Sequence, residues 1–234
     1  MKAIRLSAVL CILSCSGRLV LAQGGPGEIQ SLLAGVGTAM ADSQKSLAGY
    51  KWIQQTQMLK DGQTKGTTVQ QVQIGPDGQP IKITLSSPPP PPMQRGLRGR
   101  MMKKEMEETQ DYVKRMTSLA QDYVKPNPAA FQQQVQAGKA WLNPSPDGST
   151  VQIKFGGILK DGDSLTLTID TRIKQIRQIA ASSYLDNPQD PIAISALFQN
   201  LPDGTDYMAQ MSASSQAKGL QVQVVTLNYS RVSP

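Results

Sequence analysis

The hexapeptide Met58–Gln63, MLKDGQ, returns with two changes at Ile158–Asp163 as ILKDGD. Aspartate tolerates a turn conformation and glycine accepts a positive φ without steric cost, so each copy predicts the loop of a β-hairpin. Asp-Gly recurs at 77–78, 147–148 and 203–204, each time after a proline, which presets the first residue of a turn. The repeat therefore predicts an antiparallel sheet built from consecutive hairpins.

Apolar residues alternate with polar ones between these turns, which is the period of a β-strand. The alternating sets are Ile81, Ile83 and Leu85; Val151, Ile153 and Phe155; Leu165, Leu167 and Ile169; Ile192, Ile194, Ala196 and Phe198; and Leu220, Val222 and Val224. Strands are predicted near 50–59, 66–74, 80–86, 150–157, 163–170, 175–184, 191–199, 205–213 and 219–231. They form two blocks, and LKDG is predicted at the tip of the first hairpin in each block. Within 175–184, Ile176 and Ile179 follow Ile173 at intervals of three, which suits either a helix or a bulged strand.

The segment between the two blocks of strands has a different composition. Residues 87–100 contain the run Pro88 to Pro92 and then glycines and cations, which predicts an exposed, extended connector. Apolar residues spaced three and four apart predict helices at 28–48, 100–124 and 128–139. A long sheet twists and needs a cover for its apolar face, and these helices can supply it. The predicted fold class is α+β: a curved antiparallel sheet of about nine strands with helices on its concave face, a half-barrel.

The first residues have the layout of an export signal, with a basic start, a short apolar run and small residues near two cut points. Cleavage after Ala22 leaves residues 23–234, which we expect to form a single α+β domain. In the alternative, the motif ILSC makes Cys15 the lipidated first residue of a lipoprotein. Both alternatives predict an exported protein, periplasmic or secreted, and the second adds a lipid anchor.

The composition argues against several kinds of catalytic and metal site. The chain has no histidine, and its two cysteines, Cys11 and Cys15, lie in the predicted signal. A mature chain cut at Ala22 therefore has no Cys-His dyad, Ser-His-Asp triad or thiolate zinc site. The carboxylates Asp161, Asp163 and Asp170 follow neither EF-hand spacing nor a glycosidase pair, so turn and strand-end roles are favoured. We predict a protein that is not an enzyme and that has no cofactor and no metal.

The charge of the chain is mildly basic. The formal charge is +7, and it falls to +4 when Lys2, Arg5 and Arg18 leave with the signal, because 21 cations then face 17 acidic residues. This charge suits an anionic membrane surface or an envelope protein as partner, whereas the scarcity of aromatic residues argues against nucleic acid. The basic cluster is a candidate for such a surface, although a solvated loop has the same composition; its members are Arg95, Arg98, Arg100, Lys103 and Lys104.

A methionine stripe marks one face of the long predicted helix. Methionine adapts to irregular apolar ligands, so this face is a candidate lining for a groove that takes a lipid or acyl chain. The candidate ligand-binding residues are Met102, Met106, Val113 and Met116, with Trp52 and Trp141 at the edges of the groove. Simple packing of the helix on the sheet produces the same stripe.

The order of helix, three strands, two helices and six strands, with the stretches LPDGTDY (201–207) and VTLNYSRV (225–232), resembles known exported proteins. It is similar to LolA-like half-barrel carriers of lipoproteins and lipids and to uncharacterised exported bacterial proteins. The segment PPPPPMQRGLRGR (88–100) departs from those carriers. The resemblance implies an envelope protein, expected to be a monomer, that binds a lipid, acyl chain or lipidated peptide between sheet and helices. The alternative is a scaffolding envelope protein that fills its own core and acts through its surface.

Overall fold

A computed structural model describes residues 25–89, 96–125 and 127–232. It contains ten strands in one antiparallel sheet, in the order β3-β2-β1-β10-β9-β8-β7-β6-β5-β4. The strands are β1 (Tyr50–Lys60), β2 (Gln63–Ile74), β3 (Pro80–Ser86), β4 (Ala140–Pro144), β5 (Thr150–Gly156), β6 (Ser164–Asp170), β7 (Gln175–Tyr184), β8 (Pro191–Asn200), β9 (Asp206–Ser215) and β10 (Leu220–Arg231). The helices are α1 (Pro26–Leu47), α2 (Leu97–Val124) and α3 (Pro128–Gln136). The predicted export signal and residues 90–95 of the connector lie outside the described residues.

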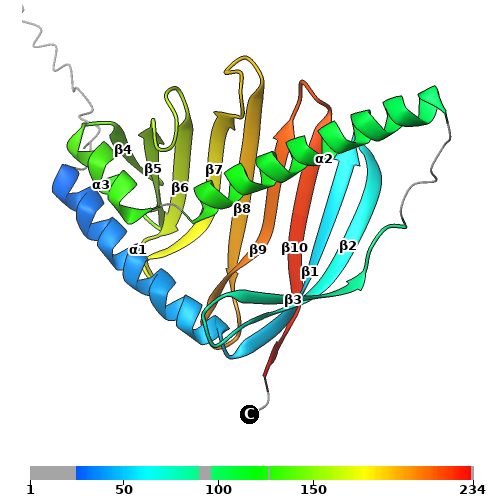
Figure 1. Cartoon of the computed structure of the whole chain (residues 1–234). Helices are drawn as coiled ribbons and strands as arrows, with labels where there is room; N and C mark the ends of the chain where they lie inside the picture. The colour runs from blue at the N-terminus through cyan, green and yellow to red at the C-terminus, as the bar shows by residue number, and fades with distance from the viewer. Residues whose placement is uncertain (1–24, 90–95, 126, 233–234) are drawn as a thin grey trace, which may run out of the picture.

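All three helices lie on one side of the curved sheet (Figure 1). We call the side of the sheet that faces the helices the inner face and the opposite side the outer face. The predicted fold class, α+β with a curved antiparallel sheet and helices on its concave face, is confirmed. The sheet is open, because β3 and β4 form its two edges and do not pair with each other.

The sheet has ten strands where the sequence predicted about nine. The additional strand is β4, which has only five residues, ends in Pro144 and follows closely on α3. So short a segment shows no clear alternation, although it forms a hairpin with the next strand of the chain, β5. One consequence is that the second LKDG lies in the loop between β5 and β6, the second hairpin of its block. The first copy joins β1 to β2, as predicted.

The segment 175–184 is the strand β7, and it contains a bulge. Ile169 pairs with Ile176 while Thr168 pairs with Gln178, so Arg177 is an extra residue on the β7 side. The extra residue explains the interval of three, because it lets both Ile176 and Ile179 point into the core. The prediction of a bulged strand is confirmed and the helical alternative is wrong.

The turn chemistry expected from Asp-Gly is also confirmed. Gly62, Gly162 and Gly204 have φ values of +74°, +80° and +86°. Glycine adopts this region freely because it has no Cβ.

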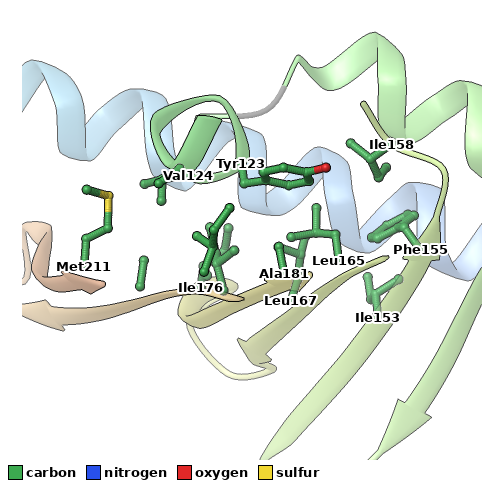
Figure 2. Close-up of a cluster of buried hydrophobic side chains, with 14 of the residues drawn as sticks. Tyr123, Val124, Ile153, Phe155, Ile158, Leu165, Leu167, Ile176, Ala181 and Met211 are labelled. Atoms are coloured by element: carbon green, nitrogen blue, oxygen red, sulfur yellow. The ribbon is translucent and has the colours of Figure 1, made fainter. Parts of the chain in front are cut away.

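The core lies between the inner face of β5 to β10 and the helices. Tyr123 and Val124 of α2 lie over Leu165, Leu167 and Ala181 of the sheet (Figure 2). Tyr123 has no exposed area, although its hydroxyl is polar. That hydroxyl donates a hydrogen bond to Asp163, so the C-terminal end of α2 is fixed to the loop before β6.

Candidate functional site

The predicted methionine stripe divides into two parts along α2. Met116 has no exposed area and Val113 is partly buried against the core. Met102 and Met106, on the same side of the helix, are 50% and 37% exposed. The C-terminal half of α2 is therefore packed, while its N-terminal half presents methionines that are only partly covered.

The reason for this difference is the composition of the strands beneath α2. The helix has 28 residues and extends from above β7 toward β1 and β2 (Figure 1). On β10 the inner face is apolar, but Val224 pairs with Thr56 of β1, and Thr56 pairs with Thr68 of β2. Apart from Met58, which pairs with Val222 of β10, the inner face of these two strands presents mainly threonine and glutamine there, with little apolar surface to bury a methionine. The contact there is polar instead, an ion pair of 3.6 Å between Lys60 and Glu105.

The two tryptophans do not edge a common groove. Trp52 stacks on Tyr229 with ring centroids 5.4 Å apart, and Tyr229 lies 4.4 Å from Tyr207. Trp141 pairs with Lys154 on β5, whereas its neighbours on β4 pair with the buried residues Ile153 and Phe155. Side chains alternate between the two faces of a strand, so Trp141 lies on the outer face, away from the helices.

The basic cluster lies at the start of α2 as far as it is described. Lys103 and Lys104 form ion pairs of 3.7 and 3.8 Å with Glu107 and Glu108, four residues further along the helix. Such exposed pairs contribute roughly 0.3–0.5 kcal/mol each, and they neutralise part of the positive charge of the cluster. Arg100 is exposed. Arg95 lies outside the described residues, as does the side chain of Arg98.

The carboxylates singled out in the sequence have structural roles. Asp163 is buried and accepts hydrogen bonds from the backbone N–H groups of Ile158, Leu159 and Lys160, at 2.8, 2.9 and 2.8 Å. Asp161 is exposed in the same loop. In the described ranges, no group of three or more Asp, Glu, Cys or His residues is placed to hold a metal ion. The sequence does not predict that Asp163 is buried, since its only distinguishing feature there is its place after the repeated glycine.

A groove that the sequence did not predict lies between α1 and the β4 edge of the sheet. Its volume is about 470 Å³. The lining combines apolar side chains with hydroxyls and two charged groups: Glu28, Ser31, Leu32, Leu142, Pro144, Gly148, Thr150, Val151, Thr171 and Lys174. The helix brings Glu28, Ser31 and Leu32 to one side because residues three and four apart lie on the same face.

Lys174 is held at the groove by an unusual backbone and a close approach to α1. Its φ is +54°, in the left-handed region that few side-chain-bearing residues adopt. Its side chain crosses α1 at Gly35, where an added Cβ would lie 2.6 Å from Cδ of the lysine. The missing side chain of Gly35 thus makes room for Lys174. Among the described residues, neither Lys174 nor Glu28 forms an ion pair.

Comparison with known proteins gives a likeness of shape only. No family model matches the chain, and no curated protein is similar to it in sequence. A DUF1329 family protein from Desulfovibrio piger is 8% identical, with 88% of this chain and 93% of that chain covered and a TM-score of 0.41. The complex of Pseudomonas aeruginosa MucA and MucB gives 10% identity, 87% and 100% coverage and a TM-score of 0.23. These scores are too low to carry an argument about function, and the predicted resemblance to LolA-like carriers is not confirmed by them.

Among the helices of the described residues, none combines the length and the apolar composition needed to span a bilayer.

Proposed function

We propose that this chain is a non-enzymatic exported protein of the cell envelope that binds an apolar chain, from a lipid or a lipidated peptide, in the groove beneath α1. The groove is the single observation that carries this proposal, because it lies between sheet and helix and is open to solvent. Leu32, Leu142, Pro144 and Val151 offer apolar contact to a ligand. A volume of about 470 Å³ falls in the range of small-molecule sites.

The energetics of the proposed binding follow from burial of apolar surface. Each methylene of an acyl chain that leaves water contributes about 0.8 kcal/mol. The affinity therefore depends on how much of the tail the groove covers. Met102 and Met106 on α2 are a second candidate contact, because they are exposed apolar side chains on the side of the helix that faces the sheet.

The test is a pair of tryptophan substitutions on α1, assayed with the fluorescent fatty acid cis-parinaric acid. Ser31→Trp places a large side chain in the groove from an exposed position and should weaken probe binding by about tenfold or more. Ala34→Trp is the matched control, since Ala34 is exposed on the same helix and does not line the groove. Thermal unfolding of both variants checks that the fold is retained.

The outcomes separate the two candidate binding surfaces. Loss of binding in Ser31→Trp with full binding in Ala34→Trp supports the groove beneath α1. Loss of binding in Met106→Lys, with Ser31→Trp unaffected, places the ligand under the N-terminal half of α2 instead. Absence of saturable binding by the unmodified protein contradicts the whole proposal.

The filled core favours a second candidate function. Met116, Ala120 and Tyr123 of α2 have no exposed area, so their own packing occupies the space between the helix and the strands below. A protein with a self-filled core acts through its surface, as an envelope scaffold. This alternative becomes the better account when the unmodified protein binds no acyl probe.

The envelope location has its own test. N-terminal sequencing and intact mass of the protein from its host should show a chain that begins at Gln23, or one that begins at a lipid-modified Cys15. A mature protein that retains Met1 contradicts export.

A further inference from the structure

Three adjacent rows of side chains on the outer face carry almost no charge, whereas the next row toward the turn between β6 and β7 contains Asp170 and its ion pairs with Arg172 and Arg177. Cross-strand pairing defines continuous rows of side chains on this face, running perpendicular to the strands. The first row, from edge strand β4 to β2, is Trp141, Lys154, Thr166, Ala180, Ser195, Ser212, Gln223, Gln57 and Thr67. It is flanked on one side by Asn143, Gln152, Thr168, Gln178, Leu197, Gln210, Val225, Gln55, Val69 and Ser86.

The row on the other side has the same character. It consists of Gly156, Ser164, Ser182, Ala193, Ser214, Gln221, Leu59 and Thr64. Within these three rows Lys154 is the single charged residue, although the chain has 24 basic and 17 acidic residues. A solvated sheet face normally mixes charges of both signs for solubility, so this face differs from an ordinary one. No helix of the described chain covers it (Figure 1).

The scarcity of charged side chains in these rows makes binding of a charged partner unfavourable. A nucleic acid or an anionic membrane is attracted by clustered lysines and arginines, and Lys154 alone cannot supply that attraction. Glutamine, serine and threonine side chains each offer both a hydrogen-bond donor and an acceptor. Hydroxyl groups are uncharged and both donate and accept hydrogen bonds. A partner rich in hydroxyl groups is therefore complementary to these side chains.

Trp141 adds a second, independent feature at the end of the first row. Its side chain is 53% exposed on the edge strand β4, an unusual position for so large an apolar ring. Tryptophan combines a flat apolar surface with one N–H donor, so it can stack against a partner that is apolar on one face and polar at its rim. A sugar ring has this form, with C–H groups on its faces and hydroxyls around its edge.

From these observations we infer that the outer face is a binding surface for an uncharged polysaccharide. The polymer lies along the first row, across the strands, with one sugar ring stacked on Trp141 and its hydroxyls bonded to serine, threonine and glutamine side chains. Neighbouring side chains in a row are about 4.8 Å apart, comparable with the length of one sugar residue. This surface is separate from the groove proposed for an apolar ligand, which opens on the opposite side of the sheet.

The experiment measures depletion of the full protein from solution by two insoluble, uncharged polymers, cellulose and chitin. We expect binding to at least one of them, with little change at high ionic strength because no charge pair is involved. Trp141→Ala should lower the affinity about tenfold or more, because it removes the aromatic ring of the row and with it the stacking contact to the sugar. Met102→Ala is the matched control, since Met102 is 50% exposed but lies on a helix of the other side. Ser31→Trp should also leave this binding unchanged, which separates it from the groove.

Three results overturn the inference. The first is no depletion by either polymer, and the second is equal binding by Trp141→Ala and the unmodified protein. The third is a self-associated protein in sedimentation equilibrium that Ser195→Asp converts to a monomer, with no polymer bound by either form. That third result assigns the face to a second copy of the chain, because an uncharged face that both donates and accepts is also complementary to itself.

Discussion

Asp163 is the last residue of the second copy of the repeated hexapeptide, and its burial and hydrogen bonds distinguish the two copies. Its counterpart in the first copy, Gln63, is exposed, whereas Asp163 is buried and accepts three backbone N–H groups and the Tyr123 hydroxyl. Burial and the bond to Asp163 raise the pKa of Tyr123 well above its usual value, so the phenol stays protonated as the donor. The second turn is thereby joined to α2 by buried hydrogen bonds, whereas the first copy reaches that helix through the exposed ion pair of Lys60 with Glu105.

We predict that Asp163→Ala lowers the free energy of unfolding by about 2–4 kcal/mol, because it leaves several buried donors without an acceptor. Asp161→Ala is the control in the same loop, and its exposed position predicts a change within about 0.5 kcal/mol. Urea denaturation followed by circular dichroism measures both changes. Equal stability of the two variants would show that the Asp163 network contributes nothing.

Asp206 is a buried carboxyl group without a full set of partners. It is 7% exposed, its Oδ1 has no hydrogen-bond partner among the described residues, and only its backbone N–H reaches the Ser43 hydroxyl of α1. Burial raises the pKa of Asp206 to about 6, although the positive charge of Arg177 opposes the shift. The folded protein therefore holds this proton more tightly than the unfolded chain does.

The sign of the resulting pH dependence follows from linkage. Between about pH 4 and pH 6 the folded state binds more protons at Asp206 than the unfolded state, so this group's contribution to stability falls as pH rises. We predict that Asp206→Asn removes this loss and stabilises the protein above pH 7 by about 1–2 kcal/mol, after allowance for partial solvent screening. The check is urea denaturation of both proteins at pH 4 and pH 7.5. A stability difference that is the same at both pH values contradicts the assignment.

At the scale of the element, α2 is one continuous helix with two different environments. Its last turns, from Met116 to Val124, lie on an apolar inner face, and its first turns extend over strands that present threonine and glutamine. The periodic methionine stripe runs through both halves. The stripe therefore predicts the face that points toward the sheet, but not how much of it is buried.

The two halves should respond differently to the same substitution. Met116→Ala creates a cavity and is expected to cost about 2–5 kcal/mol, whereas Met106→Ala should cost less than about 1 kcal/mol because its side chain is 37% exposed. Chemical denaturation measures both values. A large cost at Met106 would mean that the N-terminal half of α2 is packed more tightly than its exposure indicates.

At the scale of the whole molecule, the two blocks of strands are joined by the pairing of the first strand of the chain with the last. The first strand, β1, pairs with the last, β10, from Tyr50 opposite Arg231 to Lys60 opposite Leu220. This pairing continues one sheet through both blocks, so the first three strands depend on the C-terminal strand for their attachment. The expected consequence is cooperative unfolding of both blocks together.

The two tryptophans allow this consequence to be measured, since Trp52 lies in β1 and Trp141 in β4. We predict that Trp52→Phe and Trp141→Phe variants, each with one remaining tryptophan, show tryptophan-fluorescence midpoints that coincide with the midpoint from circular dichroism of the same variant. Two separate fluorescence transitions, or one that precedes the loss of secondary structure, would show that the blocks unfold independently.

Local chemistry was sufficient to predict most of the elements. The Asp-Gly turns, the alternation of apolar residues and the helical spacing gave nine strands and three helices whose ends lie within a few residues of those observed. These signals depend on φ preference and on the side-chain period of each element, which act over a few neighbouring residues. The strand β4 was missed because five residues are too few to show such a period.

The sequence by itself determined the turns, the type of each long element and which residues of an element share a face. Only the tertiary structure decided that β1 pairs with β10, that Trp141 lies on the outer face, that Asp163 is buried and that a groove lies beneath α1. The physical reason is range: alternation defines two faces of a strand without saying what covers either one. Whether a side chain is packed, exposed or beside a groove depends on segments far apart in the chain. These segments meet only when the strands pair and the helices pack on one side of the sheet.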